Sequence, residues 1–171
     1  NNSTYKIKLN LIGKVQLKNI QMATIAAIKS DISIKDILKV IPRIKSVNGR
    51  FEKIGKIKNN SKVILDYAHT PDALKTCLKN LKEQFSGHKV SLLFGCGGNR
   101  DQNKRAKMGK IADLYSDKIY LTDDNPRSEQ PSKIRKDIKK GIKKQKVFEF
   151  TSRTRAISKA IENLKIGEIL L

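Results

Sequence analysis

Residues 63–72 read Val-Ile-Leu-Asp-Tyr-Ala-His-Thr-Pro-Asp, and this stretch decides the fold. Its first five residues form a run of the kind found in a buried strand. Thr70 can cap a helix, Pro71 suits the first helical position, and Asp72 places a carboxylate in the first turn. A buried strand that passes directly into a capped helix is the repeating unit of a parallel α/β sheet.

The same unit repeats along the rest of the chain. Further strands are expected at residues 90–94, 118–121, 147–150 and 168–171. Helices with one apolar face are expected at residues 71–81, around 108–114, and at 131–140 and 151–164. We therefore predict a doubly wound, Rossmann-like parallel sheet with right-handed crossovers, in which ligands bind outside the carboxyl ends of the strands.

The first third of the chain has a different pattern. Residues 5–9 alternate between polar and apolar side chains, as in a half-exposed strand. The spacing of apolar residues predicts a packed helix at 17–29. Ser33, with Asp36 three positions later, predicts the start of a second helix, and Pro42 ends it.

A turn-rich passage then leads into the regular part of the chain. Within it, residues 51–57 can form a strand. The adjacent Asn59 and Asn60 mark the change of pattern. We place a domain boundary there, which divides the chain into residues 1–59 and residues 60–171.

Charge is the most unusual feature of the composition. The chain has 37 Lys and Arg residues against 16 Asp and Glu, a formal net charge of +21, which raises the question of a nucleic-acid or membrane partner. The lysines are spread over almost every segment, however, and only 5% of residues are aromatic. Readers of single-stranded nucleic acid need aromatic platforms beside a basic groove. We therefore interpret the charge as a compositional bias more than as a binding stripe. One alternative is a positive field that attracts a polyanionic small substrate such as a nucleotide, and another is a basic α/β nucleic-acid-binding module.

The two cysteines, Cys77 and Cys96, lie far apart and have neither zinc-site spacing nor the pattern of a disulfide framework. They are expected to be reduced thiols. No apolar run approaches the roughly 20 residues of a transmembrane helix, and the N-terminus lacks the core of a signal peptide. We expect a soluble, cytoplasmic protein with no membrane partner.

Polar residues follow three of the expected strands, so they should share one rim of the sheet. Residues 121–127 read Leu-Thr-Asp-Asp-Asn-Pro-Arg. Such a cluster can bind a ligand with both ammonium and carboxylate groups, and the alternative is an ordinary solvated turn.

Asp66 can accept hydrogen bonds from ribose hydroxyls and His69 can contact a phosphate or adenine. Alternatively, Asp66 satisfies loop amides and His69 is a surface side chain. The glycine-rich residues 95–101 can bring backbone amides close to an anion.

These stretches occur together, in this order and spacing, in the Mur ligase family. They are Asp66 to Leu74, Phe94 to Asp101 with Lys104, Arg105, Met108 and Gly109, and Thr122 to Arg127. Residues 60–171 therefore resemble the C-terminal, amino-acid-binding domain of a Mur ligase, in truncated form. Residues 1–59 resemble the end of that family's central ATP-binding domain.

The resemblance implies ATP-dependent amide-bond formation. In that reaction the D-glutamyl carboxylate of UDP-N-acetylmuramoyl-L-alanyl-D-glutamate becomes an acyl phosphate, which an incoming amine attacks. Asp124, Asn125, Pro126 and Arg127 match the signature of members that select meso-diaminopimelate. Arg127 and Arg100 would hold a carboxylate of that amino acid, while Asp124 and Asn125 would receive its ammonium. A folylpolyglutamate synthase-like enzyme fits these motifs less well.

The resemblance also implies a nucleotide site. Asn19 matches a position that contacts adenine, and Arg50, Asp66 and His69 match the nucleotide-facing turn. This sequence lacks the family's phosphate loop, its UDP-binding domain and the lysine that helps to hold Mg2+, so most of the ATP and Mg2+ sites should lie outside it. We expect a monomeric internal fragment, inactive alone, in which the apolar face of residues 1–58 is exposed.

Overall fold

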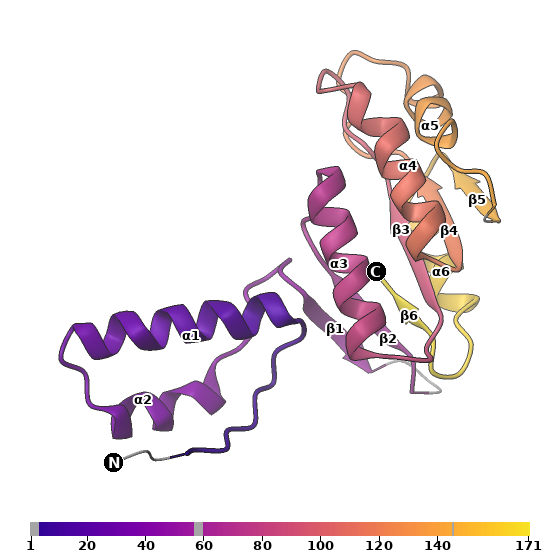
Figure 1. The fold of residues 1–171 in the computed structure, drawn as a ribbon. Coiled ribbons are helices and arrows are strands. Elements are labelled where there is room, and N and C mark those ends of the chain that lie inside the picture. The colour runs from indigo at the N-terminus through magenta and orange to yellow at the C-terminus, as the bar shows by residue number, and fades with distance from the viewer. Residues whose placement is uncertain (1–3, 57–59, 145) are drawn as a thin grey trace.

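A computed structural model describes residues 4–56, 60–144 and 146–171. The N-terminal elements are α1 (Lys14–Lys29), α2 (Ile34–Val40), the 3-10 turn η1 (Ile41–Arg43) and β1 (Glu52–Lys56). The later elements are β2 (Lys62–Leu65), α3 (Pro71–Gln84), β3 (Val90–Phe94), α4 (Asn103–Tyr115), β4 (Lys118–Thr122), α5 (Pro131–Lys139), β5 (Val147–Phe150), α6 (Arg153–Glu162) and β6 (Ile169–Leu170). Figure 1 shows α1 and α2 beside the sheet and its helices.

The strands form one six-stranded sheet in the order β1-β2-β6-β3-β4-β5. All neighbours from β2 to β5 are parallel. β1 is antiparallel to β2 and lies at the edge, with a register shift between Lys53 and Gly55. The predicted parallel α/β sheet is confirmed, and the antiparallel edge strand is an addition to it.

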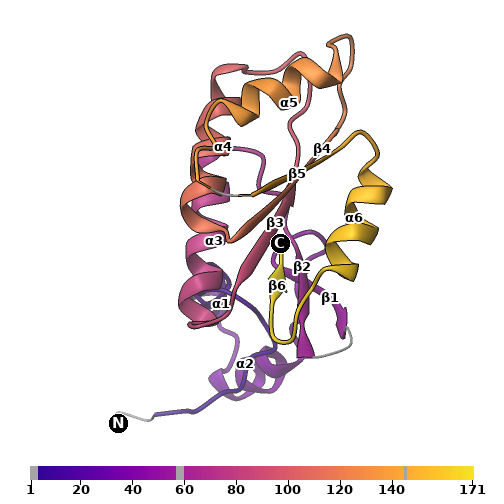
Figure 2. The same ribbon diagram turned by 90° about the vertical axis from the view of Figure 1, so that its right-hand side faces the viewer.

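The two faces of the sheet carry separate apolar cores because successive strand side chains point to opposite faces. Leu92 and Ile119 belong to the larger core, which includes residues of α3, α4 and α5. Tyr120 and Leu93 belong to the other core, where Ala160 of α6 packs. Figure 2 shows α3 and α4 on one side of the sheet and α6 on the other. The chain therefore crosses on one face as far as β5 and returns on the opposite face to β6.

Two of the predicted helix starts are confirmed by their caps. The Ser33 hydroxyl accepts a hydrogen bond from the backbone N–H of Asp36 at 3.2 Å. The Thr70 hydroxyl accepts from the N–H of Ala73 at 3.3 Å, and Pro71 occupies the first turn of α3. The strand predicted at residues 63–67 is shorter and less buried than expected. β2 ends at Leu65, and of its residues only Ile64 is buried, so the residues that follow form a loop at the rim.

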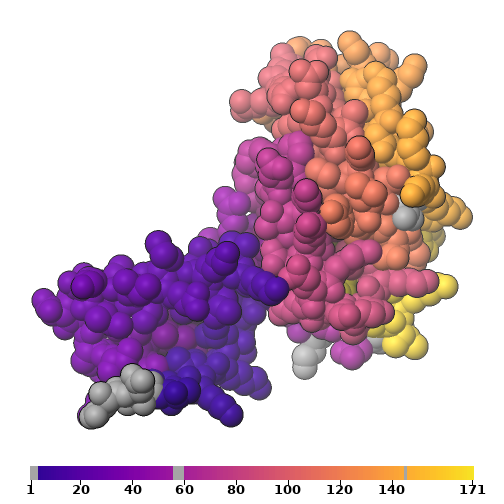
Figure 3. All heavy atoms as spheres, viewed as in Figure 1, coloured from indigo at the N-terminus to yellow at the C-terminus, as the bar shows by residue number. Residues whose placement is uncertain are grey.

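Two predictions for the N-terminal segment are wrong. Residues 5–9 have no regular secondary structure, because every strand in the described part of the chain lies after Phe51 and none pairs with them. α1 forms, but none of its residues is buried, and Met22 is 70% exposed. The expectation that this apolar face would be exposed is confirmed. Figure 3 shows the segment as a lobe beside the larger part of the molecule.

The lobe is joined to the sheet domain near the end of α3. The N–H of Gly13 donates to Gln84 Oε1 at 2.6 Å, and Lys14 pairs with Glu83 at 2.7 Å. Phe51, which is 5% exposed, packs into the larger core. Residues 57–59, on one side of the predicted boundary, lie outside the described residues, so the boundary stays a prediction. Among the described residues, no helix has the length and apolar character needed to cross a membrane.

Candidate functional site

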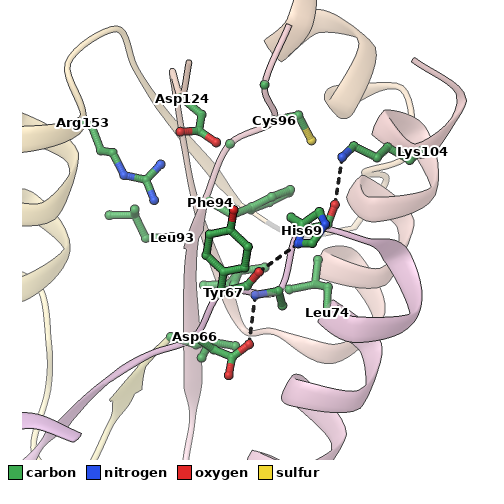
Figure 4. A pocket seen from close by; sticks show the side chains of 15 residues that line it. Asp66, Tyr67, His69, Leu74, Leu93, Phe94, Cys96, Lys104, Asp124 and Arg153 are labelled. Atoms are coloured by element: carbon green, nitrogen blue, oxygen red, sulfur yellow. Dashed lines mark hydrogen bonds between the residues drawn. The ribbon is translucent and has the colours of Figure 1, made fainter. Parts of the chain in front are cut away.

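A cavity of about 250 Å3 lies at the carboxyl ends of the parallel strands. The loop after β2, the glycine turn after β3, Asp124 after β4, Arg153 of α6 and Leu171 after β6 all contribute to its walls (Figure 4). The prediction that the three polar loops share one rim is confirmed. Ligands of parallel α/β sheets bind outside the carboxyl ends of the strands, which is where this cavity lies.

Asp66, at the end of β2, holds three local donors. Its Oδ2 accepts from the N–H of Phe51 at 2.9 Å. Its Oδ1 accepts from the N–H of Ala68 at 2.9 Å and from the Cys77 thiol at 3.1 Å. Asp66 therefore satisfies loop amides and holds the loop after β2 in place, which is the structural alternative that the sequence left open. Its role toward a nucleotide stays a prediction.

Tyr67 and His69 form an aromatic wall beside this carboxylate. Their rings meet edge to face with centroids 5.2 Å apart, and the Arg50 guanidinium lies 5.2 Å from the centroid of the Tyr67 ring. Lys104 Nζ donates to the His69 carbonyl at 2.9 Å and so ties the loop to α4. Tyr67 is 64% exposed. An exposed aromatic ring of this kind can stack on a planar base.

Asn19 and Arg50 are linked through Gln16. Asn19 Nδ2 donates to Gln16 Oε1 at 3.4 Å, and Gln16 Nε2 donates to the Arg50 carbonyl at 3.3 Å. Neither Asn19 nor Arg50 lines the cavity. Arg50 reaches the cavity wall only through its contact with Tyr67. The four predicted nucleotide residues therefore fall into two groups, with Asp66 and His69 in the cavity wall.

The glycine turn after β3 packs directly against the turn after β4. The N–H of Gly98 donates to the Asn125 carbonyl at 2.8 Å, and Arg127 Nη1 donates to the Gly98 carbonyl at 2.7 Å. A Cβ atom on Gly98 would overlap the carbonyl group of Pro126, so this close approach requires glycine. The Gly98 amide is satisfied within the protein and is not available to an anion. Arg127 has a φ of 52°, which is uncommon for a residue other than glycine.

The two adjacent carboxylates after β4 have different surroundings. Asp123 pairs with Arg135 of α5, which is 7% exposed and also donates to Glu149 at 2.8 Å. The Lys139 ammonium, followed by Arg135, lowers the pKa of the Glu149 carboxyl. Asp124 has no hydrogen-bond or ion-pair partner among the described residues, and it lines the cavity. Asp124 is therefore the carboxylate that can meet a ligand.

A second buried arginine holds the glycine turn against the helices. Arg105 of α4 is fully buried and pairs with Glu129 at 2.8 Å and with Asp137 at 3.2 Å. Glu129 also accepts from the N–H of Asn99 at 2.5 Å. The Arg105 guanidinium and the Asn99 amide together hold the pKa of the Glu129 carboxyl below its usual value. No local pattern in the sequence predicts this network, because its members come from separate elements.

Both cysteines are buried free thiols, as expected. Cys96 lines the cavity, and burial raises the pKa of its thiol to about 11. Burial, followed by the neighbouring Asp66 carboxylate, raises the pKa of the Cys77 thiol. Neither thiol is therefore an activated nucleophile at neutral pH.

Comparison with known proteins assigns this fold to a family. A family model described as Mur ligase, glutamate ligase domain, matches residues 49–171. The chain belongs to the Mur ligase family. It is 41% identical over 172 residues to the UDP-N-acetylmuramoyl-L-alanyl-D-glutamate--2,6-diaminopimelate ligase of Rickettsia montanensis. It is 43% identical over 162 residues to the enzyme of the same name from Buchnera aphidicola subsp. Baizongia pistaciae.

These matches cover 100% and 94% of this chain, but 35% and 32% of the two relatives. The chain therefore spans about one third of the length of the Mur ligases it matches. A solved structure of a UDP-N-acetylmuramoyl-L-alanyl-D-glutamate--2,6-diaminopimelate ligase superimposes with a TM-score of 0.71 at 33% identity, over 97% of this chain and 34% of that one.

Two more distant structures support the fold alone. The UDP-N-acetylmuramate-alanine ligase of Thermotoga maritima has a TM-score of 0.74 at 20% identity, over 98% of this chain and 36% of that one. The folylpolyglutamate synthase of the same organism has a TM-score of 0.70 at 24% identity, over 99% of this chain and 38% of that one. None of the relatives described here supports the nucleic-acid-binding alternative.

The cavity of this Mur ligase chain gathers only some of the predicted site residues. Asp66, His69 and Asp124 line it, whereas four predicted amino-acid-binding residues do not: Arg100, Asn125, Pro126 and Arg127. Two cations that the sequence did not single out as site residues, Lys104 and Arg153, line it as well. Lys104 follows the glycine turn closely enough to be suspected, but nothing in the local sequence marks Arg153.

The residues of this Mur ligase chain do not fit a complete magnesium site. Among the described residues, no group of three or more His, Cys, Asp or Glu side chains could hold a metal ion. Asp66, the carboxylate nearest to the nucleotide-facing turn, already accepts from three donors.

Proposed function

We propose that this chain is part of a ligase that adds meso-diaminopimelate to UDP-N-acetylmuramoyl-L-alanyl-D-glutamate. Residues 60–171 would be its amino-acid-binding domain, and residues 1–59 the last part of its central ATP-binding domain. ATP would convert the D-glutamyl carboxylate into an acyl phosphate, which the amine of diaminopimelate would attack. The observation that carries the proposal is the 41% identity, along the whole chain, to a ligase named for that amino acid.

The turn after β4 supports the choice of amino acid. Asp124 offers an unpaired carboxylate to an ammonium group. Arg127 uses one guanidinium nitrogen to bind the Gly98 carbonyl, which leaves its other N–H groups for a carboxylate. Arg100 and Asn125 would complete the contacts with the same amino-acid head, and Pro126 restricts the backbone between them. Lysine lacks the second carboxylate, so this arrangement would favour meso-diaminopimelate.

The neighbouring loop supports a nucleotide beside the amino acid. Asn19, Arg50, Asp66 and His69 would face ATP, with the exposed Tyr67 ring as an aromatic surface for the base. When bound, ATP would supply the phosphoryl group that activates the carboxylate. The ligase would act in the cytoplasm as a monomer.

Calorimetric titration of the 171-residue chain tests the amino-acid site. We expect meso-diaminopimelate to bind at least about tenfold more tightly than L-lysine, because a charge-assisted pair contributes more than about 1.4 kcal/mol. Arg127→Glu should remove this preference. Arg43→Glu, the same charge change on η1, should alter neither affinity.

Two outcomes would contradict the proposal. Equal affinity of the wild-type chain for the two amino acids would remove the basis for selecting diaminopimelate. A preference for meso-diaminopimelate that persists in the Arg127→Glu variant would show that this arginine does not hold the second carboxylate.

A further inference from the structure

One arginine in the cavity wall, Arg153, comes from α6 and not from the turn after β4. Arg153 is the first residue of α6, and Ser152 caps that helix by accepting from the N–H of Arg155 at 3.3 Å. α6 lies on the face of the sheet opposite α3 and α4, so Arg153 reaches the cavity from the other side (Figures 2 and 4). The cavity is therefore lined by charged groups from both faces of the sheet.

Arg153 differs from three of the arginines around the glycine turn because it is unpaired; Arg100, in the turn itself, also has no hydrogen-bond or ion-pair partner among the described residues, but it does not line the cavity. Arg105 and Arg135 are buried in ion pairs, and Arg127 donates to the Gly98 carbonyl. Within residues 4–56, 60–144 and 146–171, Arg153 has no hydrogen-bond or ion-pair partner. Its guanidinium points into the cavity in Figure 4. A planar group with five N–H donors suits a carboxylate, which it can bind through two parallel hydrogen bonds.

The opposite charge lies in the wall of the same cavity. Asp124, also unpaired within the described ranges, faces the space from the turn after β4. Apolar side chains line part of the wall, among them Leu74, Leu93 and Phe94. A volume of about 250 Å3 is smaller than the roughly 300–1,000 Å3 of drug-sized sites. Size and charge together match one zwitterionic head of an amino acid.

We propose that Arg153 binds one carboxylate of the incoming diamino acid, whose head enters the cavity. The inference rests on the proposed function and deepens it. Meso-diaminopimelate has two amino-acid heads, each with its own carboxylate. Arg127 and Arg100, which lie outside the cavity lining, would hold one carboxylate, and Arg153 would hold the other. Asp124 belongs to both regions, because it is part of the turn and also lines the cavity.

The test uses the 171-residue chain labelled with 15N at its arginine side chains. Meso-diaminopimelate should shift the Nε–Hε resonance of Arg153 in a titration followed by NMR.

Arg153→Gln should raise the Kd measured by calorimetry at least tenfold, which corresponds to about 1.4 kcal/mol. Arg155→Gln is the matched control, because Arg155 is exposed on the same helix but lies outside the cavity, and it should leave the Kd within twofold. Arg153→Lys should restore part of the lost affinity because it keeps the charge.

Each other outcome has a distinct meaning. An unchanged Kd in Arg153→Gln would overturn the role of Arg153 and leave the proposed function intact. If the wild-type chain does not bind meso-diaminopimelate, the proposed amino-acid site fails together with the inference. Inorganic phosphate and ADP are titrated in parallel. A shift of Arg153 by either of them, in the absence of a shift by meso-diaminopimelate, would assign the guanidinium to the nucleotide and overturn its carboxylate role.

Discussion

Replacing Gly98 with alanine should separate the two turns that form the candidate site. The new Cβ would lie 2.6 Å from the Pro126 carbonyl carbon and 3.2 Å from Glu129 Cβ, both well inside normal contact. The turns would have to move apart, which strains or breaks the hydrogen bonds from Gly98 to Asn125 and from Arg127 to Gly98. Overpacking costs about 1–3 kcal/mol. Each lost hydrogen bond adds about 1 kcal/mol.

The expected total is therefore about 3 kcal/mol or more of unfolding free energy. With a slope of about 2 kcal/mol per molar urea, the midpoint of urea denaturation should fall by about 1.5 M. Gly97→Ala is the matched control, because its Cβ would meet only the movable end of the Arg127 side chain at 3.0 Å and the Asn125 carbonyl at 3.4 Å. It should shift the midpoint by less than about 0.5 M. Equal midpoints for the two variants would refute the close approach at Gly98.

Three further predictions follow from buried and exposed groups. Arg105→Met leaves Glu129 and Asp137 without their shared partner, so it should lower the unfolding free energy by about 3 kcal/mol or more. The control, Lys159→Met, removes an exposed pair with Glu162 and should change the unfolding free energy by less than about 1 kcal/mol. Urea denaturation measures both values. The pKa of the Cys96 thiol is about 11, so its reactive thiolate form increases about tenfold for each pH unit between 7 and 10. The rate of its reaction with iodoacetamide, followed by mass spectrometry, should rise by the same factor. Rapid labelling at pH 7 would contradict the burial of this thiol. The side chains of Met22 and Ile25 are exposed, so changing both to lysine should alter the unfolding free energy by less than about 0.5 kcal/mol. The double variant should also bind less of a hydrophobic dye. A large loss of stability would show that this face of α1 is packed.

The sheet was predictable because its signals are local. Thr70 and Pro71 mark the start of α3 a few residues after a strand, and the structure has this helix start in the predicted position. The alternation at residues 5–9 is also a local signal, but a strand needs a hydrogen-bonding neighbour. The sequence does not show whether one is present. In the structure every described strand lies after Phe51, so this segment has no neighbour to pair with.

The details of the site depend on contacts between distant residues. Asp123 and Asp124 are indistinguishable as neighbouring carboxylates in the sequence. Only the position of Arg135 on α5 shows that Asp123 is paired and Asp124 is not. Arg153 reaches the cavity because α6 packs on the opposite face of the sheet, and that depends on the return crossover from β5 to β6. Motifs at strand ends therefore located the rim and three residues of the cavity wall, Asp66, His69 and Asp124, but not Lys104 or Arg153.

Ligation by a chimaeric enzyme tests the central claim most directly. The chimaera would be the Rickettsia montanensis ligase in which the matching third is replaced by this chain. The ratio of kcat/KM for meso-diaminopimelate to kcat/KM for L-lysine is the quantity to measure. We predict a ratio of at least about 100, because a site built to pair with a second carboxylate leaves charged groups unpaired when lysine binds. Equal kcat/KM values for the two amino acids, in a chimaera that ligates either one, would contradict the account.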